Sequence, residues 1–190
     1  MVHDTGVANF PIVRNLQDMG GGLHSRIAMQ AAEYYVRTGG YLPIPQMLPR
    51  ELAVQKACVV SIVQQPGRHV RGSFGTPLPR SPILAQEIIT NTVEAIVRNN
   101  IHMRPIDASS YRYAVGVFGP LERITSKEHL KPLEYGLYVR SDKGKTALLL
   151  PRRVGIETAD DQIATAIREA RIDSKNEDVT MYRFSVTFYE

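Results

Sequence analysis

The sequence predicts an α+β fold, with a mainly antiparallel sheet and flanking helices. Strand-like runs occur in pairs that are separated by turn residues, which is typical of β-hairpins. The helical patterns are few and separate two or more strands rather than alternating with single strands, which argues against a parallel sheet. The chain has 190 residues, of which 43% are hydrophobic and 22% charged, enough for one domain with a real core.

The N-terminal segment and the composition indicate how the chain is organised into domains and where the protein is located. Residues 1–24 include Gly20–Gly22 and show little periodicity, so we expect an N-terminal extension followed by one domain over 25–190. No signal-peptide pattern is present, and no apolar run approaches the roughly 20 residues of a membrane helix. The single cysteine, Cys58, excludes an internal disulfide. We expect a soluble cytoplasmic protein with no membrane partner.

The first half of the domain predicts a helix, a connector and a hairpin. Apolar residues recur every three or four positions over 25–37, which indicates a helix. Three prolines in 41–49 predict an extended connector, because proline lacks an N–H and fixes φ. The β-branched run 57–63 predicts a buried strand. The turn residues 65–67 then lead into a second strand from Val70.

A long helix and a strand follow. Ser81-Pro82 resembles a helix cap followed by proline at the first helical position, and the apolar stripe predicts a helix to about Arg98. Residues 111–118 then predict a strand.

The last part of the chain predicts a hairpin, a helix and a final strand. Residues 133–140 and 146–150 read as strands joined by the turn 141–144. Thr158, followed by two acidic residues, predicts a capped helix start. The closing segment alternates, so four residues should point to one side of a strand: Tyr182, Phe184, Val186 and Phe188.

The segment V-R-G-S-F-G, Val70 to Gly75, is the main candidate site. Arg71 could hold a carboxylate or phosphate, the Ser73 hydroxyl could donate a hydrogen bond, and Gly72 and Gly75 could let a ligand approach the backbone. The competing interpretation is a strand that ends in a glycine bulge, with Arg71 in a structural ion pair.

A catalytic role for Ser73 would require a neighbouring base. Simple alternation puts His69, Arg71 and Ser73 on one face unless a bulge intervenes. Even so, His69 and Ser73 would lie roughly 13 Å apart on an extended strand. Direct proton transfer between them is therefore not expected, and we predict a binding surface rather than a covalent catalyst.

The remaining reactive residue types give weaker signals. The five histidines show no metal-ligand spacing, so we predict no metal site. Cys58 lies in a β-branched run and should be a small buried hydrophobe. Arg152 and Arg153 follow a strand and a proline; they could bind an anion in a cleft or could simply be solvated.

The order of these segments resembles the AMMECR family, whose members are also described as AmmeMemoRadiSam system protein A. The central motif of that family reads Leu-Arg-Gly-Cys-Ile-Gly and matches Val70–Gly75 here. Leu133–Arg140 resembles the family strand "vG-x-hGl-x-v", and Leu148–Val154 resembles "lLPqV". The closing strand with Tyr182-Arg183 also agrees, so the resemblance covers roughly 25–190.

The resemblance implies a larger and a smaller α+β lobe with a cleft between them. It also implies an association with a Memo-type protein and a radical SAM enzyme. The sequence departs from the family pattern at Ser73, which replaces the motif cysteine, and over 99–105, which replaces Asp-Pro-Arg-Phe; tryptophan is absent. We therefore interpret the chain as a divergent member.

Three functions stay open at this point. The first is an accessory or enzymatic component of an AmmeMemoRadiSam-like modification system, and whether the chain is itself an enzyme is open, as is any cofactor. The second is a nucleotide- or nucleic-acid-binding regulatory module, for which the net charge of +4 leaves room. Aromatic residues make up only 7%, without a stacking motif, so this comes second. The third is a protein-docking domain without chemistry.

Overall fold

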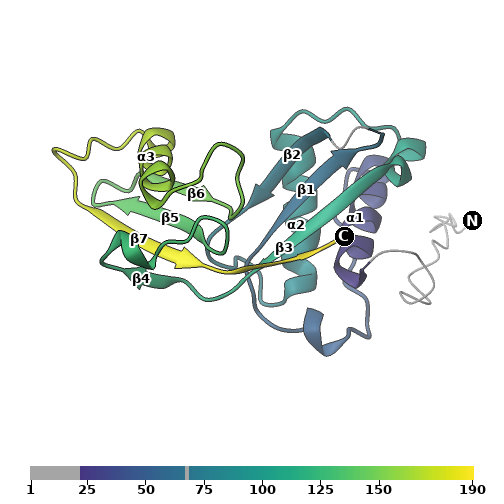
Figure 1. Cartoon of the computed structure of the whole chain (residues 1–190). Coiled ribbons are helices and arrows are strands. Elements are labelled where there is room, and N and C mark those ends of the chain that lie inside the picture. Colours follow the sequence, from purple (N-terminus) through teal and green to yellow (C-terminus); the bar gives the residue numbers. More distant parts are fainter. Residues whose placement is uncertain (1–21, 67–68) are drawn as a thin grey trace, which may run out of the picture.

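The computed structural model describes residues 22–66 and 69–190. Figure 1 shows two lobes, and each is built on a four-stranded antiparallel sheet. The predicted α+β class with an antiparallel sheet and flanking helices is confirmed. The expected N-terminal extension falls mostly on residues 1–21, which lie outside the described residues.

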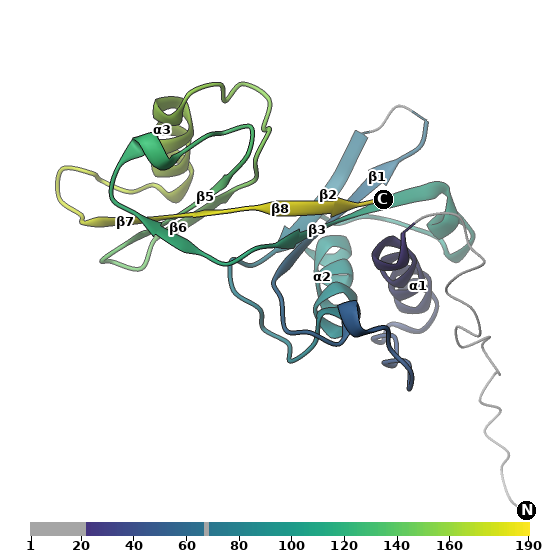
Figure 2. The same ribbon diagram turned by 60° about the horizontal axis from the view of Figure 1, so that its bottom comes forward.

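The first, larger lobe contains two helices and the sheet with the order β2-β1-β3-β8. Its helices are α1 and α2, and short 3-10 turns follow α1 and precede β3. Figure 2 shows both helices on the same side of this sheet. The elements are α1 (Leu23–Thr38), β1 (Cys58–Gln64), β2 (His69–Gly75), α2 (Leu84–Arg98), β3 (Tyr111–Phe118) and β8 (Val186–Tyr189).

The second lobe contains one helix and the sheet with the order β4-β7-β5-β6. Its helix, α3, begins with the predicted Thr158 cap, whose side chain accepts a hydrogen bond from the Asp161 N–H. The elements are β4 (Glu122–Ile124), β5 (Gly136–Ser141), β6 (Thr146–Leu149), α3 (Ala159–Ala170) and β7 (Val179–Phe184).

The closing segment joins the lobes, as the single long ribbon in Figure 1 shows. The predicted strand is in fact two strands, because β7 pairs in the second sheet and β8 in the first, with Ser185 between them. The Gly119 N–H donates to the Ser185 carbonyl at this crossing. The Phe118 and Phe184 rings, with centroids 4.8 Å apart, pack here in a cluster to which both lobes contribute.

Alternation along β1 decides which residues of the first sheet face the helices. Cys58, Val60 and Ile62 are fully buried in the core formed with α1 and α2. Val59, Ser61 and Val63 therefore point to the opposite side of the sheet. The helix α3 packs on β5 and β6 of the other sheet, so no helix of residues 22–66 and 69–190 covers that side of the first sheet. None of the helices in the described part of the chain is long and apolar enough to cross a bilayer.

Three predicted boundaries were wrong. Helix α1 begins at Leu23 rather than Ser25. Helix α2 begins at Leu84 with Ile83 at the cap position, so Ser81 lies two residues before the cap; its N–H donates to the buried carboxylate of Glu87. The strand expected from Leu133 begins at Gly136, since the preceding residues form a hydrogen-bonded turn.

Candidate functional site

The side of the first sheet that faces away from the helices carries most of the predicted motif. Cross-strand pairing arranges its residues in three rows. We call this surface the open face. The row next to the second lobe is Gly75, Val59, Gly116 and Phe188; the middle row is Ser73, Ser61 and Ala114; the outer row is Val70, Val63 and Arg112.

A β-bulge in β2 corrects the expected alternation of the motif. Val63 pairs with Val70 whereas Ile62 pairs with Gly72, so Arg71 is the extra residue. The bulge reverses the direction of the side chains that precede it. His69 pairs with Gln64 and so lies on the opposite face from Ser73. The prediction that simple alternation puts His69, Arg71 and Ser73 on one face was therefore wrong.

Arg71 is exposed, and its guanidinium donates to the Gln64 Oε1 at 3.3 Å. Gln64 shares the alternation of Ile62, so it belongs to the helix-covered side of β1. This hydrogen bond holds the Arg71 guanidinium against Gln64 of the inner strand β1, on the side of the sheet opposite to Ser73. The structural ion pair that was considered as an alternative is not seen, because the partner is a neutral amide.

Ser73 forms a hydroxyl pair with Ser61 across the strands. The Ser73 Oγ donates to the Ser61 Oγ at 2.8 Å, and Ser73 is exposed. Neither a histidine nor a carboxylate contacts this pair within the described residues, so the geometry provides no base to activate a nucleophile. The arrangement suits hydrogen bonding to a ligand.

Both motif glycines have a packing reason. A Cβ at Gly72 would lie 2.6 Å from the Cβ of Asn99 at the end of α2. A Cβ at Gly75 would lie 2.6 Å from the Cys58 carbonyl oxygen. Such distances are well inside van der Waals contact. The glycines therefore let β2 approach α2 and β1 closely.

The loop after the motif is held by polar residues that sequence reasoning missed. The Glu87 carboxylate is fully buried and accepts the backbone N–H groups of Arg80 and Ser81 at 3.0 and 2.8 Å. Asn91 accepts a hydrogen bond from the Arg80 guanidinium at 3.0 Å. The sequence did contain a hint of this cluster, because two polar residues, Glu87 and Asn91, lie four residues apart on the otherwise apolar face of the helix. Arg80 also stacks on the Phe74 ring, 5.0 Å from its centroid.

Cys58 confirms the interpretation as a small buried hydrophobe. It is fully buried, and burial raises the pKa of its thiol to about 12. The Asn91 amide donates to the Cys58 carbonyl at 2.9 Å, which ties α2 to β1. The thiol therefore stays protonated and inert at neutral pH.

Arg152 belongs to the second lobe. It lies in the turn after β6 with φ +59°, and its Nε donates to the Leu133 carbonyl at 3.2 Å. Arg153 forms a two-point ion pair with Glu169 of α3. The hydrogen bond to the Leu133 carbonyl ties Arg152 to its own lobe rather than to the motif, so its place in a shared site remains a prediction.

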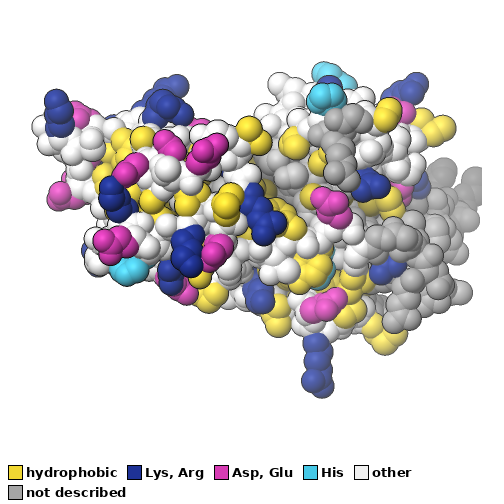
Figure 3. Space-filling view, in the orientation of Figure 1, with side chains coloured by type: hydrophobic (Ala, Val, Ile, Leu, Met, Phe, Trp, Pro, Cys, Tyr) yellow, Lys and Arg dark blue, Asp and Glu magenta, His cyan; other side chains and the backbone are white. Residues whose placement is uncertain are grey.

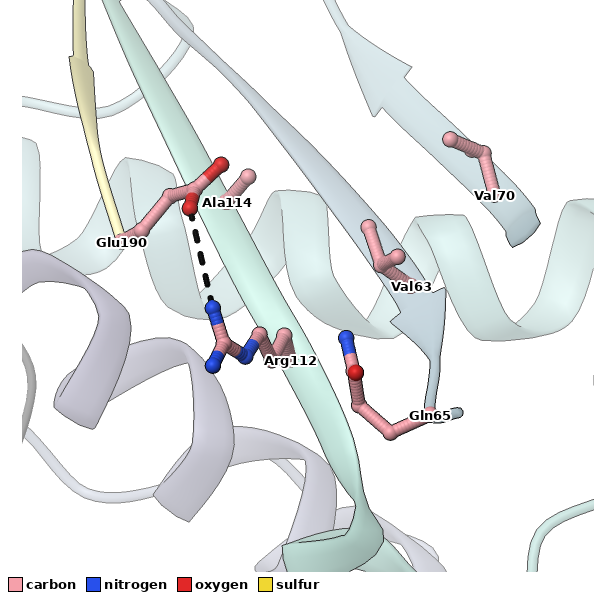
Figure 4. A pocket seen from close by; sticks show the side chains of 6 residues that line it. All are labelled: Val63, Gln65, Val70, Arg112, Ala114 and Glu190. Carbon is pink, nitrogen blue, oxygen red and sulfur yellow. Dashed lines mark ion pairs between the residues drawn. The ribbon is translucent and has the colours of Figure 1, made fainter. Parts of the chain in front are cut away.

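A pocket of about 180 Å³ lies at the outer end of the open face. Figure 4 shows its side chains in front of the strands, with the helices behind. Of the motif residues, Val70 lines this pocket. The lining residues are Val63, Gln65, Val70, Arg112, Ala114 and Glu190. We call it the outer pocket.

Charge over this side of the molecule is mixed. Figure 3 shows basic and acidic side chains interspersed, without one dominant sign. Within residues 22–66 and 69–190, no group of three or more His, Cys, Asp or Glu side chains is arranged to hold a metal ion. The open face therefore offers hydroxyl, guanidinium, carboxylate and apolar groups, which suit a ligand of mixed polarity.

Comparison with known proteins gives the family. The AMMECR1 family model matches residues 25–189. An uncharacterised Thermotoga maritima protein is 31% identical over 166 residues, which cover 86% of this chain and 94% of that protein. Protein CA_C1420 of Clostridium acetobutylicum is 31% identical over 165 residues, but the chain spans only 34% of its length.

The fold has a solved counterpart. The crystal structure of the uncharacterised protein PH0010 from Pyrococcus horikoshii superposes with a TM-score of 0.76 and 23% sequence identity, covering 87% of this chain and 88% of that one. The family match over nearly the whole described chain, together with this shared two-sheet fold, leads to one conclusion: the chain belongs to the AMMECR1 family.

Proposed function

We propose that the protein is the substrate-binding component of an AmmeMemoRadiSam-like modification system and that its open face is the binding surface. The observation that supports this proposal most strongly is the location of Val70, Ser73 and Gly75 on a sheet face that no helix of the described chain covers. A Memo-type protein and a radical SAM enzyme are the proposed partners.

The role in the system is binding rather than covalent catalysis. The Ser73 hydroxyl contacts Ser61 instead of a base, and the Cys58 thiol is buried and protonated. A surface that lacks an activated nucleophile can still hold and orient a substrate while a partner enzyme reacts with it. Arg71 in the bulge of β2 and Arg152 in the second lobe are secondary candidates for ligand contacts.

The test is the activity of the reconstituted system with paired variants. Ser73→Ala removes one hydroxyl of the pair, and Thr187→Ala removes an exposed hydroxyl from the same sheet on its helix-covered side. We expect Ser73→Ala to reduce turnover about tenfold, the effect of losing about 1.4 kcal/mol of binding. We expect Thr187→Ala to leave it unchanged. Equal activity of both variants and the parent would end the proposal for this surface.

A nucleic-acid module is the alternative outcome of a second measurement. Titration with a single-stranded oligonucleotide at low salt should show no binding, because the charges on this side are mixed. Tight binding that weakens linearly with the logarithm of salt concentration would instead assign the open face to nucleic acid.

A further inference from the structure

The outer pocket combines a cation, a carboxylate and an apolar floor within one small depression. Arg112 and Glu190 stand on its one side, and Val63, Val70 and Ala114 line the rest. We propose that it binds a zwitterionic small molecule of the α-amino-acid class with a branched apolar side chain. Its carboxylate would contact Arg112 and its ammonium Glu190. This inference deepens the proposed function, because it names a ligand class for the open face.

Arg112 and Glu190 form a long, exposed ion pair (Figure 4) that leaves hydrogen-bonding capacity for a ligand. The Arg112 Nη1 and the Glu190 Oε2 are 4.0 Å apart, beyond the range of an N–H···O hydrogen bond. Their side chains are 57% and 64% exposed, so the pair contributes little to folding. The guanidinium therefore keeps donors for a carboxylate, and Glu190 keeps acceptors for an ammonium group.

The apolar part sets the size and shape of the ligand. Val70 is 62% exposed, so an alkyl group that covers it would remove apolar surface from water. A pocket of about 180 Å³ is smaller than the roughly 300–1,000 Å³ of sites for drug-sized ligands. A single amino acid matches this scale better than a cofactor.

One polar group at the border of the pocket has no hydrogen-bond partner in the part of the chain that the structure describes. The Gln65 Nε2 is buried and makes no hydrogen bond to the described residues. A buried donor without an acceptor is uncommon and costs stability. A ligand carboxylate held by Arg112 would lie on the same side of the sheet, where a small side-chain movement of Gln65 would let it donate.

The juxtaposed charges select against simpler ions. A carboxylate without an ammonium group would bind Arg112 but would be repelled by Glu190. An amine without a carboxylate would be attracted by Glu190 but repelled by Arg112. A zwitterion whose ammonium and carboxylate groups share one carbon satisfies both residues.

The experiment is a titration of the full chain with three matched probes: L-leucine, isovalerate and isoamylamine. Methyl NMR signals of Val63, Val70 and Ala114 report occupancy of the pocket. We expect leucine to shift these signals and the other two probes to bind at least tenfold more weakly. Arg112→Gln and Glu190→Gln should each weaken leucine binding about tenfold or more, the effect of losing a charge-assisted hydrogen bond. Arg168→Gln, an exposed arginine on α3, should have no effect.

Thermal unfolding of each variant shows whether it is folded. The proposal is overturned if leucine leaves the three methyl signals unchanged up to about 10 mM. The dissociation constant would then be too high for a functional site. It is also overturned if isovalerate binds as tightly as leucine, or if Glu190→Gln tightens binding. The titration needs no partner protein. Failure of leucine binding with a continued effect of Ser73→Ala on turnover would therefore reject the ligand class and keep the proposed function.

Discussion

Replacing Gly72 by alanine tests whether the motif glycine serves packing or ligand approach. The added Cβ would lie 2.6 Å from both the Cβ and the Cγ of Asn99. Ordinary contact between carbon atoms is about 3.5–4.0 Å, so Asn99 would have to move by about 1 Å. Its side chain is held by hydrogen bonds to the Ala95 and Ser73 carbonyls, at 2.9 and 3.3 Å. Movement would strain or break these bonds.

Overpacking of this kind costs about 1–3 kcal/mol. Removing a glycine from the unfolded chain offsets about 0.4–1 kcal/mol of that cost. We therefore expect Gly72→Ala to lower the free energy of unfolding by about 1–2 kcal/mol, with the Ser73 hydroxyl pair intact. Urea unfolding followed by far-UV circular dichroism measures this, since the chain contains no tryptophan for fluorescence.

A double-mutant cycle isolates the clash. Asn99→Gly removes the atoms that the new Cβ would meet, so Gly72→Ala should cost less in that background than in the parent. Asn99→Ala is the matched comparison, because it keeps the Cβ and should not relieve the clash. The packing argument fails if Gly72→Ala leaves stability within about 0.5 kcal/mol of the parent. Loss of function at unchanged stability would show that the glycine exists for ligand approach.

Three further predictions concern buried polar and charged groups. Glu87→Ala should lower the free energy of unfolding in urea by about 2–6 kcal/mol, because it leaves two backbone donors, one of them at Ser81, without an acceptor. Glu87→Gln should lower it clearly less, and equal losses for the two variants would contradict this reasoning. Lys145 beside Glu177 lowers the pKa of that carboxyl to about 2, so their contribution to stability is complete above its ordinary value of 4.5 and is lost as pH falls toward 2. Lys145→Met should flatten the pH dependence of the unfolding midpoint in that window, and an unchanged slope would refute the role of the pair. Cys58, with its pKa raised to about 12, should react with Ellman's reagent at pH 8 only after denaturation, and rapid labelling of the folded protein would show that the thiol is accessible.

Local patterns predicted the elements of the fold well where their causes are local. The strand at Tyr111–Phe118, the Thr158 cap and the turn that ends in Gly144 were all predicted correctly, because each depends on neighbouring residues. The alternation from Tyr182 to Phe188 was also predicted correctly. However, the transfer of the chain from one sheet to the other at Ser185 was missed. Alternation continues unbroken through that residue, so only the pairing partners reveal the change.

The candidate site was harder to predict because its geometry depends on distant residues. The bulge at Arg71 arises from the register with β1, and no residue of β2 signals it alone. Ser61 and Arg112 belong to other strands, and the sequence offered only a serine within an apolar run and an arginine in an alternating strand as hints. The prediction of a cap at Ser81 was wrong because the helix begins three residues later, at Leu84, and the buried Glu87 carboxylate holds the Ser81 N–H in the loop before it.

The measurement that tests the central claim most directly is the turnover of the reconstituted system with a bulky charge on either side of the same sheet. Ser73 and Thr187 are both exposed, so glutamate at either position should leave the protein folded. The open-face account predicts that Ser73→Glu abolishes turnover, because the charge lies where the substrate would bind. It predicts that Thr187→Glu, on the helix-covered side, retains parental turnover. Full activity of a folded Ser73→Glu protein would contradict the account.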